Sequence, residues 1–116
     1  MSLSIKQRSS SEVMILDLSG RLWILDLQLR DTMNDLLGMG QCYFVLNLSG
    51  VDYIDSSGLG QLISIWSSIR NKNGYMTILK PNKRVQRLFE ITRLNTIFEV
   101  LDDEATAVRK AHRVSA

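Results

Sequence analysis

The stretch from residue 43 to residue 70 constrains the fold most, because it predicts a strand, a loop and a helix in immediate succession. Residues 43–46 form an apolar run of β-formers, as in a strand buried on both faces, and turn-forming residues follow at 47–50. Beyond the loop at 55–60, apolar residues recur at helical spacing. They are Leu59, Leu62, Ile63, Trp66 and Ile69. Because sites collect at the carboxyl ends of strands and helix N-termini attract anions, we expect the functional site in this loop.

The remaining elements alternate around this unit. Strands are predicted at residues 3–6, 13–18, 75–79 and 97–100, and further helices at 25–37, from 83 to 92 and from 104 to 111. The first two strands should pair as an antiparallel hairpin, and the later strands should follow parallel crossovers. We therefore predict an α/β sandwich: a mixed sheet with an antiparallel N-terminal pair and about four helices packed on it. With 116 residues, 45% of them hydrophobic, residues 1–116 should form one domain.

Composition narrows the functional classes. The formal net charge is +2, with acids and bases interspersed, so no basic stripe predicts direct binding to nucleic acid. The single cysteine, Cys42, excludes an internal disulfide framework and fits a reducing compartment. No apolar run approaches the roughly 18 residues of a membrane span, and the N-terminus has no apolar signal region. The sequence therefore predicts a cytoplasmic protein without membrane insertion.

Enzymatic chemistry finds little support in the residues. A serine nucleophile needs a nearby base, and the only histidine, His112, lies in the C-terminal tail. Cysteine, histidine and acidic residues occur at no recognised ligand spacing, and no phosphate-binding glycine loop with its lysine is present. Asp55 at a strand end is reminiscent of phosphoaspartate receivers, but the acidic pair that they carry after an early strand is missing. We expect no catalytic residue, no metal and no cofactor.

The central motif resembles a known family. Residues 45–48, followed by 51–60 with their Asp55-Ser56-Ser57-Gly58-Leu59-Gly60 loop, are similar to the signature of STAS domains, and specifically of bacterial anti-sigma factor antagonists. The resemblance extends upstream to residues 18–22 and downstream to 85–92, and so covers nearly the whole chain. It implies the STAS-like sandwich already expected from the pattern of elements.

The resemblance also implies a function. In the family, the first serine after the aspartate, here Ser56, is phosphorylated by a partner that is both a serine kinase and an anti-sigma factor. A phosphatase of the PP2C type reverses the modification. The unphosphorylated antagonist binds the anti-sigma factor and frees a sigma factor, so transcription is regulated without contact between this chain and DNA. Asp55, Ser57, Gly58 and Leu59 would then form a partner-binding loop around the serine.

Several alternatives stay open on the residues alone. Asp, Ser and Gly are also the residues of helix caps and turns, and Ser57 is the better candidate for the cap. Leu59 is either a core residue or part of the docking surface. Trp23 stands near a place where many family members carry an aspartate, and it is either a core residue or an exposed anchor for a partner.

A second function class shares the fold. In it, the chain is a STAS subunit of a transporter or a sensing complex, and the motif serine is structural or binds a small anion. Neighbouring genes would discriminate the two classes, because a serine kinase favours the antagonist and transporter subunits favour the alternative.

Overall fold

Strands and helices alternate along the chain after an N-terminal pair of strands in the computed structural model, which describes residues 3–24 and 26–113. The strands are β1 (Ser4–Ser10), β2 (Val13–Leu22), β3 (Tyr43–Ile54), β4 (Tyr75–Leu79) and β5 (Glu99–Leu101). The helices are α1 (Gln28–Gly38), α2 (Ser56–Asn71), α3 (Lys83–Ile91) and α4 (Glu104–Arg113), with a 3-10 turn η1 (Leu94–Thr96) before β5.

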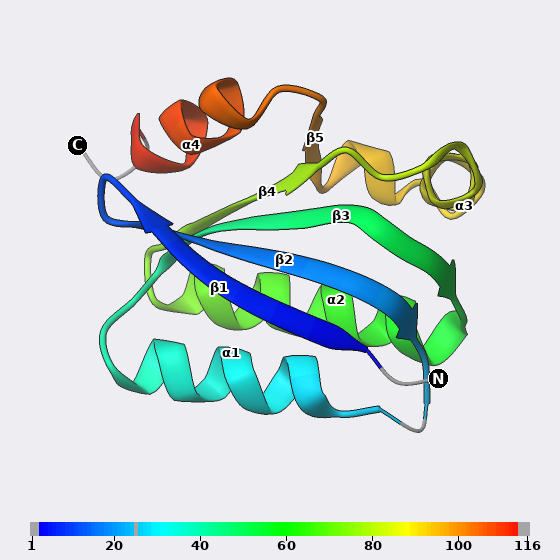
Figure 1. Ribbon diagram of the computed structural model, residues 1–116, viewed down its shortest axis with the longest axis horizontal. Coiled ribbons are helices and arrows are strands. Elements are labelled where there is room, and N and C mark those ends of the chain that lie inside the picture. Colours follow the sequence, from blue (N-terminus) through cyan, green and yellow to red (C-terminus); the bar gives the residue numbers. More distant parts are fainter. Residues whose placement is uncertain (1–2, 25, 114–116) are drawn as a thin grey trace.

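The strands form one mixed sheet in the order β1-β2-β3-β4-β5. β1 pairs with β2 in antiparallel fashion, and every later pairing is parallel, with a helix in each crossover. This confirms the predicted mixed sheet with its antiparallel N-terminal pair. Because parallel strands point the same way, the carboxyl ends of β2, β3 and β4 meet at one edge of the sheet, where α2 and α3 begin (Figure 1).

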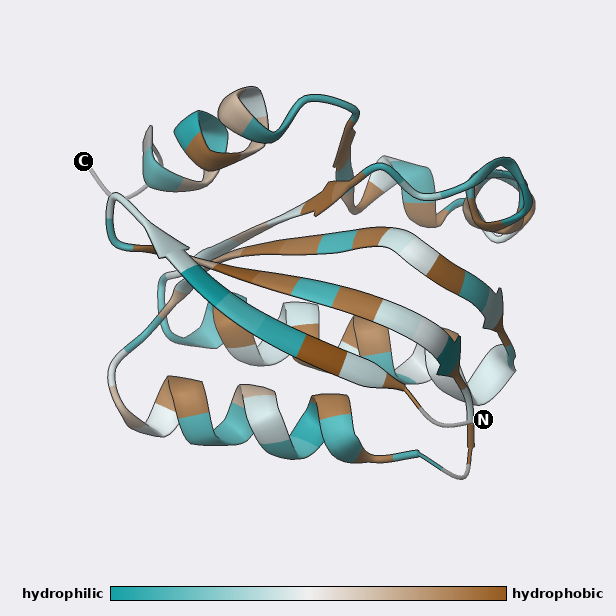
Figure 2. Ribbon diagram, in the orientation of Figure 1, coloured by the Kyte–Doolittle hydropathy of each residue, from teal (hydrophilic) through white to brown (hydrophobic). Residues whose placement is uncertain are grey.

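Helices cover both faces of the sheet. Figure 1 shows α1 and α2 on one side and α4 on the other. The larger apolar cluster lies between the sheet, α1 and α2, and α3 contributes Val85 and Phe89 to it. A smaller cluster lies beneath α4 and includes Ala107 and Ala111. The apolar segments of β2 and β3 run through the middle of the sheet between these layers (Figure 2), and the chain forms the single compact α/β domain that the sequence predicts.

The buried face of α2 differs in phase from the predicted one. Ile63 is 40% exposed and Trp66 is only partly buried, so the prediction that both lie on the buried face was wrong for Ile63 and only half right for Trp66. Gln61, a polar residue outside the predicted apolar set, is only 8% exposed. The buried apolar residues of α2 are Leu59, Leu62, Ile65 and Ile69. The helix is therefore turned so that a glutamine faces the interior of the protein.

β3 is longer than the sequence predicts, and the turn predicted within it does not occur. The side chain of Asn47 donates to the Asp17 carboxylate on β2 at 2.8 Å, so the asparagine links two strands instead of ending one. A side chain at Gly50 would place its Cβ 2.8 Å from the Cβ of Ser19, so glycine permits a close approach of the strands at an irregularity in their register. β3 consequently continues to Ile54, close to the functional loop.

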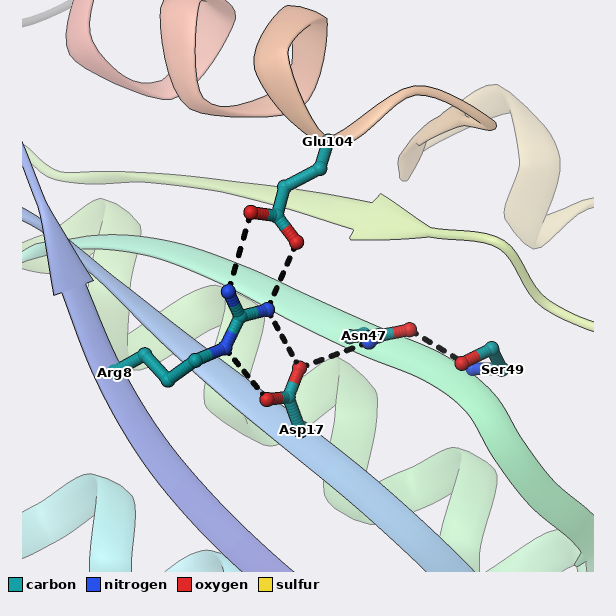
Figure 3. A network of polar contacts seen from close by, with 5 residues as sticks. All are labelled: Arg8, Asp17, Asn47, Ser49 and Glu104. Carbon is teal, nitrogen blue, oxygen red and sulfur yellow. Dashed lines mark hydrogen bonds and ion pairs between the residues drawn. The ribbon is translucent and has the colours of Figure 1, made fainter.

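An ion-pair network ties α4 to the sheet (Figure 3). The guanidinium of Arg8 on β1 donates to Asp17 on β2 (Nε to Oδ2, 2.7 Å) and to Glu104 at the start of α4 (Nη2 to Oε1, 2.8 Å). The hydrogen bond from Arg8 lowers the pKa of the Asp17 carboxyl, and Arg8 likewise lowers the pKa of Glu104. The network joins β1 to α4 through Arg8 and Glu104, which lie 96 positions apart in the sequence.

Candidate functional site at the start of α2

Asp55 is the residue that caps the N-terminus of α2. Its backbone is extended (φ −97°, ψ −178°), and its Oδ1 accepts a hydrogen bond from the Gly58 N–H at 2.7 Å. This is the geometry of an N-cap, in which a side-chain oxygen satisfies a backbone donor that the helix leaves unpaired. The prediction that Ser57 is the better cap was wrong, because the cap must precede the first helical residue and Ser57 already lies inside the helix.

Ser56 is the first residue of α2 and is exposed. Within the part of the chain that the structure describes, its hydroxyl makes no hydrogen bond, and the cap of the helix is made by Asp55 instead. The serine also stands at the positive end of the α2 dipole, where an anion is stabilised by typically 0.3–1 kcal/mol, order of magnitude, at an exposed site. The geometry therefore presents a hydroxyl that another protein can reach, in a place that tolerates added negative charge.

The residues that follow Ser56 point inward. A Cβ on Gly58 would lie 2.2 Å from the Leu22 carbonyl oxygen, so the end of β2 packs directly on the first turn of α2. Leu59 is 8% exposed and belongs to the larger apolar cluster, which settles it as a core residue. Of the loop that the sequence predicts to contact a partner, Ser56 is thus exposed and Ser57 partly exposed, whereas Gly58 and Leu59 are buried.

The side chains of Asp55 and Gln61 hold the connection between β2 and α1 next to the first turns of α2. The Asp55 Oδ2 accepts from the Ile24 N–H at 3.2 Å. The Gln61 Nε2 donates to the carbonyl oxygens of Trp23 and Asp26, at 3.2 Å each. Sequence periodicity missed Gln61, because nothing in the spacing shows that these two carbonyls need a donor. The connection is anchored from the other side as well, since the Asp26 carboxylate accepts from the Leu3 N–H at 2.7 Å.

Aromatic and basic side chains gather at the carboxyl ends of β2 and β3, the strand that leads into the serine loop. The guanidinium carbon of Arg21 is 5.6 Å from the centroid of the Trp23 ring and 5.6 Å from that of the Tyr53 ring. Trp23 is partly exposed and Tyr53 is 42% exposed, so Trp23 is not a fully buried core residue, and its contact with a partner stays a prediction. The roles of Arg21 and Tyr53 were missed in the sequence, because the two residues meet only as partners across β2 and β3.

The described residues offer Ser56 no histidine base. His112 lies in α4, and its Nε2 is 3.8 Å from the Glu12 carboxylate, which precedes β2 at the opposite end of that strand from the site. Across residues 3–24 and 26–113, no three His, Cys, Asp or Glu side chains gather closely enough to hold a metal ion. In the same ranges, no helix is long and apolar enough to cross a bilayer. What the site provides is an exposed hydroxyl on the first turn of a capped helix.

Comparison with known proteins identifies the family. The model of the STAS domain matches residues 4–107, which include the whole sheet and the serine loop. This chain belongs to the STAS domain family.

Within this family, the chain is similar to proteins named as anti-sigma factor antagonists. An anti-sigma F factor antagonist of Paenibacillus polymyxa is 32% identical over 118 residues, which cover 99% of this chain and 100% of that protein. The crystal structure of a Thermotoga maritima protein, provisionally named an anti-sigma factor antagonist, matches with a TM-score of 0.86 at 28% identity and covers 94% of this chain and 95% of that one. The Bacillus protein SpoIIAA in its phosphorylated form shares the fold at 18% identity, with a TM-score of 0.71 and coverage of 91% and 98%.

Proposed function

We propose that this chain is an anti-sigma factor antagonist whose binding to an anti-sigma factor is switched by phosphorylation of Ser56. One observation carries the proposal: the Ser56 hydroxyl is exposed on the first residue of α2, while Asp55 performs the capping. The names of two similar proteins, both given as anti-sigma factor antagonists, support an anti-sigma factor as the partner.

Phosphorylation would change the charge of the site and leave its frame intact. A phosphate adds about −1.5 to −2 charges and three acceptor oxygens at the position of one neutral hydroxyl. The N-terminal end of α2 stabilises that charge within the chain, so the fold is expected to persist. A partner surface that fits the neutral loop would face a dianion next to the Asp55 carboxylate. Bringing like charges together at an interface costs several kcal/mol, order of magnitude, and about 1.4 kcal/mol already changes affinity tenfold.

The family resemblance supplies the other components of the proposal. The anti-sigma factor is itself the serine kinase, and a PP2C-type phosphatase removes the phosphate. The unphosphorylated chain binds the anti-sigma factor in the cytoplasm, and a sigma factor is released to direct transcription. The chain acts by binding, without catalysis and without contact with nucleic acid.

Two substitutions of one residue test the switch by calorimetric titration with the purified cognate anti-sigma factor. Ser56→Ala removes the acceptor hydroxyl without adding charge, so it should bind like the wild type and become insensitive to ATP. Ser56→Asp places an anion at the loop and should weaken binding about tenfold or more. Ser67→Asp, an exposed serine near the other end of the same helix, is the matched control and should bind like the wild type.

Peptide mass spectrometry after incubation with the kinase and ATP should locate a single phosphate on Ser56. Phosphate on Ser57, or equal affinity for the wild type, Ser56→Ala and Ser56→Asp, would contradict the switch. That result would favour the subunit of a transporter or sensing complex, in which the serine is structural.

A further inference from the structure

One face of α3 meets the end of β3 across a groove. Four residues of α3 lie on one side of the helix, because they are spaced three, one and three positions apart. They are Arg84, Arg87, Leu88 and Ile91. Tyr53 of β3 forms the other side of the groove, and the groove between β3 and α3 has a volume of about 330 Å³. Figure 1 shows α3 beside the end of β3, and Asn82, the cap of α3, donates to the carbonyl oxygen of Val51 on β3 at 2.9 Å.

The groove leaves apolar surface in water. Ile91 is 69% exposed and Tyr53 is 42% exposed, although both stand next to well-packed elements. Each Å² of apolar surface kept in water forgoes about 25 cal/mol, so the exposed parts of these side chains do not stabilise the isolated chain. An apolar group placed between them would remove both from solvent.

The charges along the groove are positive and unpaired. Among residues 3–24 and 26–113, neither Arg84 nor Arg87 makes an ion pair. Glu90, the acidic residue of α3, lies at a separate hollow on the other side of the helix, together with Gln86. Arg21 packs against the Tyr53 ring at one end of the groove, and none of the described carboxylates forms an ion pair with it. Guanidinium groups bind carboxylates through paired, directional hydrogen bonds, so these arginines favour acidic groups.

We propose that the groove between β3 and α3 is a docking site for an amphipathic segment of the anti-sigma factor, in which an apolar side chain lies between carboxylates. The apolar side chain packs against Leu88 and Ile91, and the carboxylates pair with Arg84 and Arg87. This inference rests on the proposed function, because it names the surface that the same partner uses. Tyr53 lies three residues before Ser56 in the chain, so one partner can cover the groove and the serine together.

The charge pattern argues against a second copy of the chain in the groove. A two-fold dimer places the same patch of both subunits face to face, so Arg84 and Arg87 would meet their own copies. Like charges juxtaposed in an interface cost several kcal/mol, order of magnitude. A small anion alone would satisfy the arginines but would leave Ile91 in water. A protein segment with apolar and acidic side chains satisfies both parts of the groove.

Charge reversal tests the docking site against a control of equal charge. The groove variant is Arg84→Glu with Arg87→Glu. The control is Lys83→Glu with Arg109→Glu, two exposed positions outside the groove that change the net charge by the same amount. The purified cognate anti-sigma factor is titrated into each variant by calorimetry at low and high salt, and thermal melts verify that both variants fold.

The groove variant should bind at least about tenfold more weakly than the control. Salt should weaken binding of the wild type but not of the groove variant, because salt screens the attraction in the first and the repulsion in the second. Ile91→Ser should weaken binding without changing the salt dependence. Equal affinity of the groove and control variants for the anti-sigma factor would overturn the inference about the groove. If Ser56→Asp still weakens binding in that case, the proposed function stands although the groove is not the docking site. A wild-type chain that does not bind the anti-sigma factor would instead refute the proposed function.

Two further results would assign the groove to another occupant and so overturn the inference. The first is a wild-type dimer in sedimentation equilibrium that dissociates in the groove variant. The second is binding of inorganic phosphate to the wild type that the groove variant loses while its affinity for the anti-sigma factor is unchanged.

Discussion

The carboxylate of Asp55 accepts a hydrogen bond from the backbone N–H of Gly58 at 2.7 Å, and this contact places the cap of α2 one residue before Ser56. The acid and the serine of the loop therefore have separate tasks. Asp55 fixes the start of the helix and, through its second oxygen, the Ile24 backbone, whereas the Ser56 hydroxyl stays exposed. A regulatory hydroxyl can be modified without loss of the cap only if another residue makes the cap.

The division of tasks predicts unequal losses of stability when each residue is replaced by alanine. Asp55→Ala removes the cap and should lower the free energy of unfolding by about 1 kcal/mol, within the usual range of about 0.5–2 kcal/mol. Ser56→Ala should change it by less than about 0.5 kcal/mol, as is usual for an exposed residue. Urea denaturation followed by circular dichroism measures both. A larger loss for Ser56→Ala than for Asp55→Ala would mean that the serine, and not the aspartate, caps α2.

Two glycines of the same helix should respond in opposite directions to substitution by alanine. At Gly58 the new Cβ would lie 2.2 Å from the backbone oxygen of Leu22, so the end of β2 would have to move and stability should fall by about 1–3 kcal/mol. At Gly60 nothing lies within 4 Å of the new Cβ, and alanine should raise stability by up to about 1 kcal/mol through helix propensity. Thermal melts of the two variants provide the measurement, with each serving as the control for the other.

The Arg8 network predicts a loss of stability in acid. The hydrogen bond from Arg8 holds the pKa of Asp17 below its ordinary value. The charged carboxylate therefore contributes stability that is fully present above the unfolded pKa of about 4 and is lost as the pH falls through the lower folded pKa. The contribution should be about 1 kcal/mol, because the pair is partly exposed to solvent.

Asp17→Asn removes the titrating group and keeps its shape. Its free energy of unfolding should be lower than that of the wild type at pH 7, and the difference should shrink as the pH falls below about 4. Urea titrations at several pH values test this. A difference that stays constant down to pH values of about 2 would show that Asp17 does not stabilise the fold through its charge.

The packing of the Phe89 ring against the Phe98 ring predicts a large cost for one core substitution. Phe89 of α3 is 1% exposed and meets the Phe98 ring edge to face, with centroids 5.6 Å apart. Phe89→Ala should lower the free energy of unfolding by about 3–5 kcal/mol, whereas Ile91→Ala on the exposed side of α3 should cost far less. Chemical denaturation of the two variants measures both free energies of unfolding. Similar losses of stability for Phe89→Ala and Ile91→Ala would mean that α3 packs with another face toward the core.

The sequence by itself determined the order of elements and the position of the serine loop. Apolar periodicity of two and of 3.6 residues is a local property, so the strand before Asp55 and the helix after it could be predicted from neighbouring residues. The antiparallel first pair and the parallel crossovers followed from the same order through general rules of chain connection. The family motif then pointed to Ser56.

Tertiary structure alone decided which residues surround that serine. The turn expected at residues 47–50 is replaced by a continuous strand, in which the Asn47 side chain donates a hydrogen bond to Asp17 on the neighbouring strand. Gln61 faces inward because two carbonyl groups from the preceding connection needed a donor. Arg21 and Tyr53 meet across a strand pairing whose register no local pattern reveals. Contacts between distant segments depend on register and packing, which the spacing of residues along one segment does not specify.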